Sequence, residues 1–318
     1  MKNRPPAEPR REHFASRPTK RYLAATRPPF LLAAFVAALL GIATASYSGV
    51  MLNVWTAGLT LLGAVLVHAG INVFNDYYDA LNGTDALNTE RLYPFTGGSR
   101  LIQNGVFSPR ETRNFAMILF GLSALIGGVL MTQAGWPLFW LGLVGLLIGW
   151  AYSAPPLALN SHGWGELSVA LGFGLLMPLG ADMVQRHAFA PLPLLASLPY
   201  ALLTANLLYI NQFPDRKADA LAGKHHWVVR LGTDKARWGY LALAVSAYFI
   251  LILETAFGNL PVWALLGALP LPLSMLAAMD LMQFADRPEH LARAIRLTII
   301  AALTHGLLLS IGLTIAAA

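Results

Sequence analysis

The chain has 318 residues, of which 56% are hydrophobic and 12% are charged, and its mean hydropathy is +0.55. Apolar runs long enough to cross a bilayer recur along it, which excludes an ordinary soluble globular domain. It contains no cysteine, so disulfides, thiolate metal sites and thiol redox chemistry are excluded, and any metal must use oxygen or imidazole ligands.

Residues 1–24, rich in Pro, Arg and Glu, are predicted to form a disordered basic tail that touches anionic lipid headgroups. Residues 25–318 are predicted to form one transmembrane domain. Because backbone polar groups in lipid must be satisfied within their own segment, each span is expected to be helical. We expect an all-α, polytopic fold of about nine helices around a central cavity. The spans are predicted at about 28–46, 54–81, 112–133, 136–153, 165–185, 191–213, 236–257, 260–282 and 292–316.

The net charge of +6 would by itself fit a nucleic-acid partner, but its distribution follows the predicted topology. Of the 22 Lys and Arg residues, eight lie in 1–27, four in 82–113, six in 214–237 and three in 284–296. Only Arg186 falls in a loop of the opposite side. This asymmetry predicts a multi-pass protein of the cell (inner) membrane with a cytoplasmic N-terminus, and no nucleic-acid partner.

A ladder of Asn and Asp at four-residue spacing occurs twice, and both copies lie near the cytoplasmic ends of predicted helices. The second span carries Asn75 and Asp79, and the sixth carries Asn211, Asp215 and Asp219. Residues four apart lie on one helix face, about 6 Å apart along the axis. Acidic groups next to hydrocarbon are costly unless a metal, a partner or a water-filled cavity compensates them. The ladders therefore predict a functional cation site that faces the cytoplasm.

The loops that follow the two ladders are basic and contain glycines. The first includes the turn Gly97-Gly98-Ser99 and Arg100, and the second includes Lys217 and Gly223-Lys224. Carboxylates beside Arg and Lys suit a ligand made of Mg²⁺ and pyrophosphate, because Mg²⁺ is bound by a few carboxylates together with substrate phosphates. Arg and Lys would neutralise the remaining phosphate oxygens.

These residues resemble the signatures of the UbiA superfamily of intramembrane aromatic prenyltransferases. The matching motifs are Asn75-Asp76-x-x-Asp79, Asn211-x-x-x-Asp215-x-x-x-Asp219 and the stretch 152–157, YSAPPL. The stretches 72–85, 97–100 and 223–232 are most similar to the branch that prenylates 1,4-dihydroxy-2-naphthoate in menaquinone synthesis. The resemblance implies that the domain binds a polyprenyl diphosphate through Mg²⁺, ionises it, and lets an aromatic acceptor capture the carbocation.

The resemblance also implies roles for individual residues. The Mg²⁺ ligands would be Asn75, Asp79, Asp85, Asn211, Asp215 and Asp219. The catalytic residues would be Asp79, Asp215, Asp219 and, behind the ligands, Asp76. The diphosphate would contact Arg27, Arg100, Lys217 and Lys224. The allylic cation would be shielded by Tyr77, Tyr78, Tyr152, Tyr209 or Phe213. Helical spacing, independently of the resemblance, puts His68 and Asn72 on the ladder face as acceptor-pocket candidates, where His68 would orient an acceptor carboxylate or take a proton.

The chain departs from the superfamily pattern at two places. Position 83 is Gly where a third Asp commonly stands, and Asp85 is what the naphthoate branch resembles there. No Lys or Arg follows the Tyr-Ser motif, where Leu157 and Ala158 stand instead.

Other roles are open for several of these residues. Asn72 and Asn75 would also fit hydrogen bonds between helices, and His68 would fit a buried, hydrogen-bonded histidine. Glu166 is either a charge favoured at a helix N-terminus or a residue behind the metal ligands. The pair His225-His226 lacks a third metal ligand and is expected to be solvated.

Other functions remain open at this level. The acceptor could be 4-hydroxybenzoate, homogentisate, a haem-like ring or a lipid alcohol. A secondary transporter would carry charges near the bilayer midplane, whereas these lie at helix ends. A CDP-alcohol phosphotransferase would need the motif D-x-x-D-G-x-x-A-R, which this chain lacks. The sequence leaves the oligomeric state and the isoprenoid length undefined.

Overall fold

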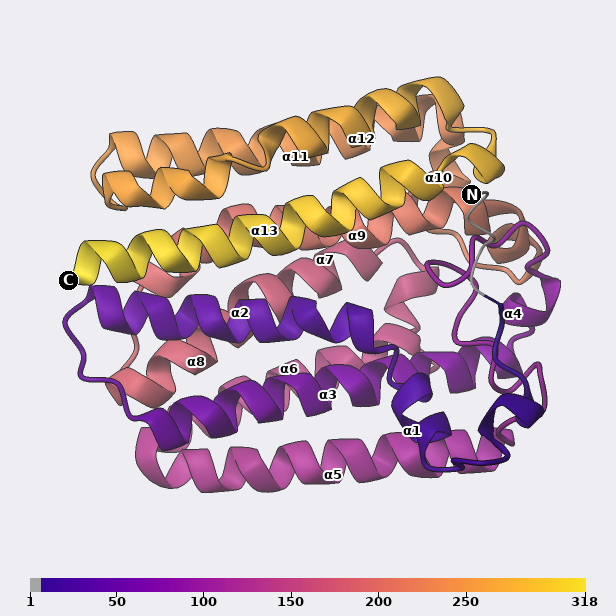
Figure 1. Ribbon diagram of the computed structural model, residues 1–318, viewed down its shortest axis with the longest axis horizontal. Coiled ribbons are helices and arrows are strands. Elements are labelled where there is room, and N and C mark those ends of the chain that lie inside the picture. The colour runs from indigo at the N-terminus through magenta and orange to yellow at the C-terminus, as the bar shows by residue number, and fades with distance from the viewer. Residues whose placement is uncertain (1–6) are drawn as a thin grey trace.

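The computed structural model describes residues 7–318, and within this range nine helical spans are long and apolar enough to cross a membrane (Figure 1). This confirms the all-α, membrane-spanning fold class. Seven spans are single helices: α2 (Pro28–Tyr47), α3 (Val54–Leu81), α5 (Pro109–Ala134), α6 (Trp136–Ser153), α9 (Leu192–Leu221), α11 (Thr233–Ala256) and α13 (Ala292–Ala317). The largest difference from the prediction is at the end of α9, which continues eight residues past 213 and carries Asp215 and Asp219 on helical backbone.

The other two spans are composite. The fifth, Gly165–Arg186, consists of α7 (Gly165–Val169), a π-helical segment η3 (Ala170–Leu176) and α8 (Met177–Arg186). The eighth consists of the 3₁₀ segment η4 (Val262–Ala268) and α12 (Leu271–Phe284). π-Helical turns inside helices occur frequently at functional sites, and η3 lines the cavity described below.

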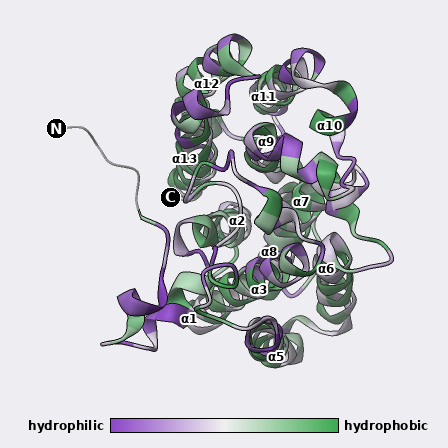
Figure 2. Cartoon of the chain, turned by 90° about the vertical axis from the view of Figure 1, so that its right-hand side faces the viewer, coloured by the Kyte–Doolittle hydropathy of each residue, from purple (hydrophilic) through white to green (hydrophobic). Residues whose placement is uncertain are grey.

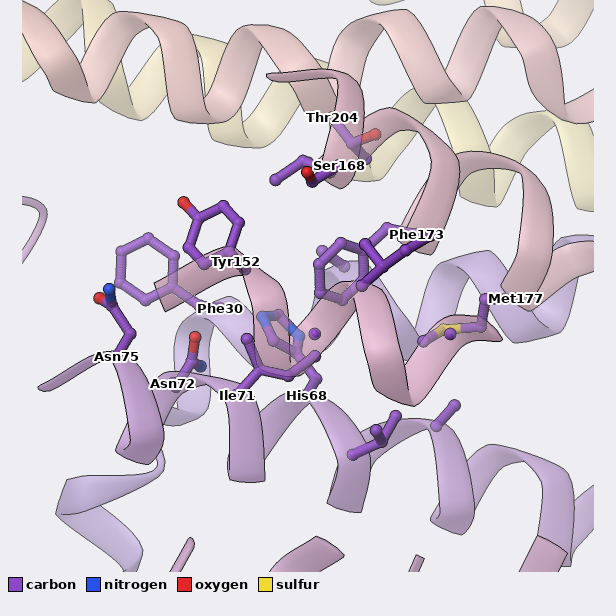
Figure 3. A pocket seen from close by; sticks show the side chains of 18 of the residues that line it. Phe30, His68, Ile71, Asn72, Asn75, Tyr152, Ser168, Phe173, Met177 and Thr204 are labelled. Carbon is purple, nitrogen blue, oxygen red and sulfur yellow. The ribbon is translucent and has the colours of Figure 1, made fainter. Parts of the chain in front are cut away.

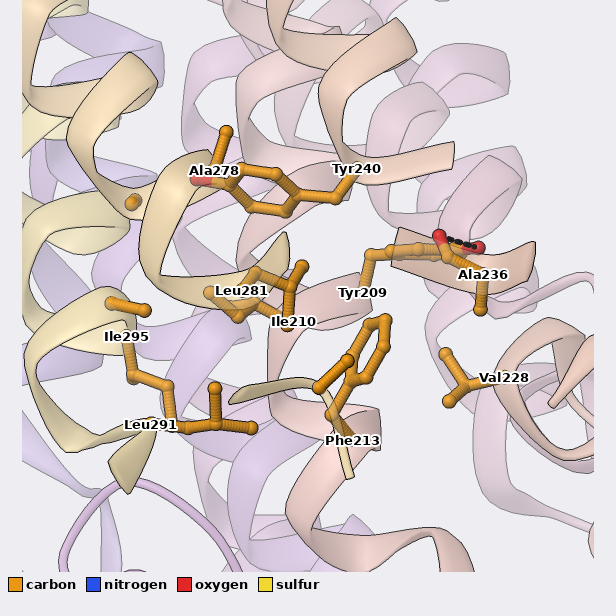
Figure 4. Packing of buried hydrophobic residues seen from close by; sticks show 13 residues of the cluster. Tyr209, Ile210, Phe213, Val228, Ala236, Tyr240, Ala278, Leu281, Leu291 and Ile295 are labelled. Carbon is orange, nitrogen blue, oxygen red and sulfur yellow. Dashed lines mark hydrogen bonds between the residues drawn. The ribbon is translucent and has the colours of Figure 1, made fainter. Parts of the chain in front are cut away.

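Helices α2 and α9 form the centre of the bundle. In their most apolar windows 61% and 67% of residues are buried, against 17% in α5 and in α6, which lie at the outside of the bundle and also line the cavity described below. On one side of α9, Tyr209 and Phe213 pack against Tyr240 of α11 and Leu281 of α12 (Figure 4). This contact anchors α9 to the C-terminal helices and fixes the rotation of its polar face.

The connecting segments with polar side chains gather at one end of the bundle. Figure 1 shows α4 (Thr84–Leu87), α10 (Trp227–Leu231) and the 88–108 loop together there, at the end opposite the C-terminus. Figure 2 looks onto this end, where hydrophilic residues lie on the loops around α1 (Lys20–Ala25) and α10. Three short 3₁₀ turns complete the fold: η1 (Arg11–Phe14), η2 (Leu159–Ser161) and η5 (Pro288–His290).

The segment before α2 packs on this polar end. Glu8 accepts a hydrogen bond from Arg91 Nε at 2.7 Å, and Asn104 Nδ2 donates to Pro9 O at 2.9 Å. These contacts place the start of the described segment against the 88–108 loop, and the disorder predicted for 1–24 stays a prediction. Residues 1–6 lie outside the described range.

Candidate active site

A cavity of about 690 Å³ runs through the bundle. Its lining extends from Asp79, near the C-terminal end of α3, to Leu130 and Val184, near the C-terminal ends of α5 and α8. Both ladders lie at its polar end, whereas α5, α6, η3 and α8 supply an apolar wall over the rest of its length. The cavity therefore joins a charged mouth to a long hydrophobic chamber.

The second ladder is held by hydrogen bonds from two loops. Asn88 Nδ2 donates to Asp215 Oδ1 at 2.6 Å, and His226 Nε2 lies 3.0 Å from Asp219 Oδ2. His226 is only 2% exposed, so the prediction that it is solvated is wrong. The reason is that the chain turns back after α9, which brings the start of α10 against the ladder. Asn211 Oδ1 is buried and has no hydrogen-bond partner within residues 7–318.

The first ladder meets the second through one lysine. Lys224 Nζ lies 2.8 Å from Asp79 Oδ1 and 3.4 Å from Asp219 Oδ1, so its ammonium bridges α3 and α9. Burial alone would lower the pKa of Lys224, but the carboxylates of Asp79 and Asp219 outweigh burial and raise it. Lys224 is therefore a cation that compensates both ladders. The two ladders stand together at one end of the molecule, as the topology predicted.

Asp85 reaches the same mouth because the chain bends at Gly83. Helix α3 ends at Leu81, Gly83 adopts φ +82°, and α4 then directs Asp85 into the cavity. Burial raises the pKa of Asp85 well above its usual range, and the carboxylates of Asp79 and Asp76 raise it further. The Gly at position 83, which departs from the superfamily pattern, is thus the bend that places Asp85.

The glycine turn lies directly against Asp85. Gly98 has φ +73°, and a Cβ added there would lie 2.5 Å from Asp85 Oδ2. Asp76 is buried behind the ladder and accepts a hydrogen bond from Ser99 N at 3.2 Å, which ties this turn to α3. Asp76 does not line the cavity. Asp76 therefore lies behind residues predicted to bind Mg²⁺, and its role stays a prediction.

The donor set at the mouth fits Mg²⁺. Four carboxylates line it, from Asp79, Asp85, Asp215 and Asp219, against the two cationic side chains of Arg27 and Lys224. The side-chain oxygen of Asn211 has no hydrogen-bond partner in the described chain. Within residues 7–318, no three acidic or imidazole side chains already converge as a metal site. Mg²⁺ is usually bound by one or two carboxylates together with water and phosphate oxygens, and the carboxylates at the mouth are of that kind.

Two of the four basic residues assigned to the diphosphate stand elsewhere. Arg100 donates to the backbone oxygen of Asp85 and pairs with Glu8, and it does not line the cavity. Lys217 is exposed and pairs with Glu90 at 2.6 Å. It follows Asp215 by two residues, so helical geometry turns it away from the ladder. Arg27 and Lys224 do line the cavity.

Most of the assigned aromatic residues lie outside the cavity. Tyr209 and Phe213 belong to the cluster of Figure 4, and Tyr209 OH donates to Ala236 O at 3.0 Å. Tyr77 and Tyr78 lie beside Phe74, away from the lining. Rotation explains three of the four, because Tyr77, Tyr209 and Phe213 each lie two residues from a ladder position on their own helix. Tyr78, which follows Asn75 by three residues, instead packs edge-on against Phe74. Tyr152 does line the cavity, as do Phe30 and Phe173 (Figure 3).

Asn75 and Asn72 each make a contact between elements and also line the cavity. Asn75 Nδ2 donates to Ser153 Oγ at 3.0 Å, and Asn72 Nδ2 donates to Thr26 O at 3.1 Å. Glu166 is buried and accepts a hydrogen bond from Gln212 Nε2 at 2.7 Å. Gln212 lines the cavity, whereas Glu166 lies behind Gln212 and does not line it. The sequence did not predict the contacts of Asn88 and Gln212, because these contacts depend on which elements pack against one another.

Fold and site together define a multi-span membrane protein with a paired acidic site at the mouth of an apolar cavity. The sequence model of the UbiA prenyltransferase family matches residues 27–313. The chain therefore belongs to this family. It is a prenyltransferase, which removes the transporter and phosphotransferase alternatives.

Relatives cover almost the whole chain. The 1,4-dihydroxy-2-naphthoate octaprenyltransferase of Escherichia coli (strain K12) is 30% identical over 301 residues, which are 93% of this chain and 95% of the relative. The 2-carboxy-1,4-naphthoquinone phytyltransferase of Synechocystis is 28% identical over 280 residues, 86% of each chain. The structure of a UbiA homolog from Archaeoglobus fulgidus bound to DMAPP and Mg²⁺ has a TM-score of 0.65 at 19% identity. It covers 91% of this chain and 98% of that one, and it shares the fold.

Proposed function

We propose that this prenyltransferase moves a polyprenyl group from a polyprenyl diphosphate to 1,4-dihydroxy-2-naphthoate, with Mg²⁺ as cofactor. The observation that carries the proposal is the cavity, in which two acidic ladders and two cations at one end open into an apolar chamber. A polyprenyl diphosphate has the same division into a charged head and a long apolar tail.

The side chains at the mouth suit the departure of pyrophosphate. When bound, Mg²⁺ would supply Lewis-acid stabilisation of the negative charge that develops on the leaving group. Asp79, Asp85, Asp215 and Asp219 would hold it, together with the oxygens of Asn75 and Asn211. Arg27 and Lys224 would contact phosphate oxygens that the metal leaves free.

The reaction is an exchange of one bond for another at the first isoprenoid carbon. The allylic C–O bond breaks and its electron pair leaves with pyrophosphate. An electron pair of the acceptor ring then forms the new C–C bond, and the ring carbon loses its proton or carboxyl group. Tyr152 and Phe30 line the cavity near the mouth, where aromatic faces would stabilise the allylic cation.

Naphthoate is favoured over other acceptors by two observations. The named activity of the E. coli relative is transfer to 1,4-dihydroxy-2-naphthoate. The bend at Gly83 that presents Asp85 belongs to the stretch that resembles the naphthoate branch. We also propose that the mouth faces the cytoplasm in the cell (inner) membrane, because the basic loops lie at that end.

An acceptor assay tests the proposal. Purified protein with Mg²⁺ and a radiolabelled polyprenyl diphosphate is offered 1,4-dihydroxy-2-naphthoate and 4-hydroxybenzoate side by side. We expect a prenylated product with naphthoate, no product in excess EDTA, and at least tenfold lower kcat/KM with hydroxybenzoate. Preferential prenylation of hydroxybenzoate, or of a lipid alcohol added to the panel, would overturn the choice of acceptor.

A further inference from the structure

His68 lies on the ladder face of α3, deeper in the cavity than the acidic mouth. It precedes Asn72, Asn75 and Asp79 by four, seven and eleven residues, which places it about 6, 10 and 16 Å further along the helix axis. It lines the cavity, and Figure 3 shows it beside Ile71 and Phe173. The distance from Asp79 leaves room for a diphosphate, the reacting carbon and an aromatic ring.

No hydrogen bond within residues 7–318 involves the imidazole of His68. The side chain is 7% exposed, and its Nδ1 is buried without a hydrogen-bond partner in the described chain. His305, which is fully buried outside the cavity, donates from Nδ1 to Gly267 O at 2.7 Å, although its Nε2 also has no hydrogen-bond partner in the described chain. A buried polar group without a partner is costly, and one that lines a cavity is placed to be satisfied by a ligand bound there.

The surroundings of His68 fit a flat ring rather than an isoprenoid tail. The ring centroids of His68 and Phe173 are 4.4 Å apart, and in Figure 3 Phe30 and Tyr152 lie on the side of His68 toward Asn75. An isoprenoid tail has no polar atom to offer, and the apolar wall of α5 and α6 suits it better. A hydroxylated aromatic ring offers both a face for stacking and a group for the imidazole.

We propose that His68 binds the acceptor, with one imidazole nitrogen accepting a hydrogen bond from a ring hydroxyl. This inference rests on the proposed function and deepens it, because it assigns the acceptor subsite. A neutral imidazole has one acceptor nitrogen and one donor nitrogen. Accepting the hydroxyl proton in a hydrogen bond increases electron density in the ring and orients the carbon that attacks the isoprenoid.

The test compares His68→Leu and His68→Gln with His305→Asn, which changes a buried histidine away from the cavity. Acceptors are 1,4-dihydroxy-2-naphthoate and its two mono-O-methyl ethers. We expect His68→Leu to raise the KM for the acceptor at least about tenfold and leave the KM for the polyprenyl diphosphate unchanged. Wild type should prefer the free hydroxyl over one of the ethers, and His68→Leu should lose that preference. His68→Gln, which can still accept a hydrogen bond, should retain part of it.

Several outcomes would overturn the assignment. One is an equal loss with hydroxyl and ether acceptors, and another is a change confined to the KM of the diphosphate. If His68→Leu does not fold, His68→Gln decides: a preference for the free hydroxyl that is reduced but not abolished supports the assignment, and an undiminished preference overturns it. If wild type prenylates no acceptor, the proposed function fails first. Calorimetric titration of the naphthoate into wild type and His68→Gln then still shows whether His68 contributes to binding.

Discussion

Lys224 holds one carboxylate of each ladder, and so it stands in the middle of the charged mouth. Breaking a buried ion pair from one side leaves uncompensated charge and costs about 3–5 kcal/mol. We therefore expect Lys224→Gln to lower the melting temperature in EDTA. Added Mg²⁺ should raise the melting temperature of this variant by more than that of wild type, because the carboxylates then depend on the metal alone.

Lys217→Gln is the matched control for this prediction. Lys217 is exposed and pairs with Glu90 at the surface, where an ion pair contributes little. The melting temperature of Lys217→Gln should equal that of wild type, both with and without Mg²⁺. Equal behaviour of the two variants would show that Lys224 does not compensate the ladders.

At the scale of single elements, the turn at Gly97-Gly98-Ser99 determines where Asp85 stands. Gly98 approaches Asp85 so closely that Gly98→Ala must displace either the turn or the carboxylate. We expect this variant to lose at least about tenfold in kcat/KM, since small misplacements of reacting groups are costly. Initial rates of prenyl transfer at saturating Mg²⁺ measure the effect.

Gly105→Ala is the control that distinguishes the effect of the contact between Gly98 and Asp85 from the effect of backbone strain. Gly105 also has positive φ, +66°, but a Cβ there meets nothing within 4 Å. Backbone strain should cost each alanine variant about 1 kcal/mol of stability, and Gly98→Ala should lose more because its Cβ also clashes with Asp85. Only Gly98→Ala should lose activity, and equal rates in the two variants would contradict the role of the turn.

The elements show what the sequence could and could not predict. Span positions followed from hydropathy, and the ladders followed from four-residue spacing. The same spacing would have excluded Lys217 and Tyr209 from the cavity, because each lies two residues from a ladder position. By contrast, the contacts of Asn88 with Asp215 and of His226 with Asp219 depend on how two loops fold back, and no periodic pattern records that.

At the scale of the whole molecule, sequence predicted nine spans and two ladders at one end, but not the depth of the chamber. The apolar wall combines faces of α5, α6, η3 and α8 that are separated widely along the chain. Their rotation is set by packing such as the cluster around Phe213, which local sequence does not encode. The lining of the chamber is therefore a property of the packed bundle.

The absence of cysteine makes the proposed orientation directly testable. Met51→Cys places a thiol in the exposed turn between α2 and α3, and Asp286→Cys places one in the exposed loop before α13. In intact cells, a membrane-impermeant maleimide should label the first variant. The second should be labelled only after permeabilisation, and the reverse pattern would place the mouth on the other side.

The central claim is that both ladders hold one magnesium diphosphate, and the measurement that tests it is the coupling between them. Binding of an unreactive prenyl thiodiphosphate with Mg²⁺ is measured for wild type, Asp79→Asn, Asp215→Asn and the double variant. If the ladders share the ligand, each single variant should lose most of the affinity, and the double variant should lose much less than the sum of the two losses. Strictly additive losses, or full binding after either substitution, would contradict a shared site.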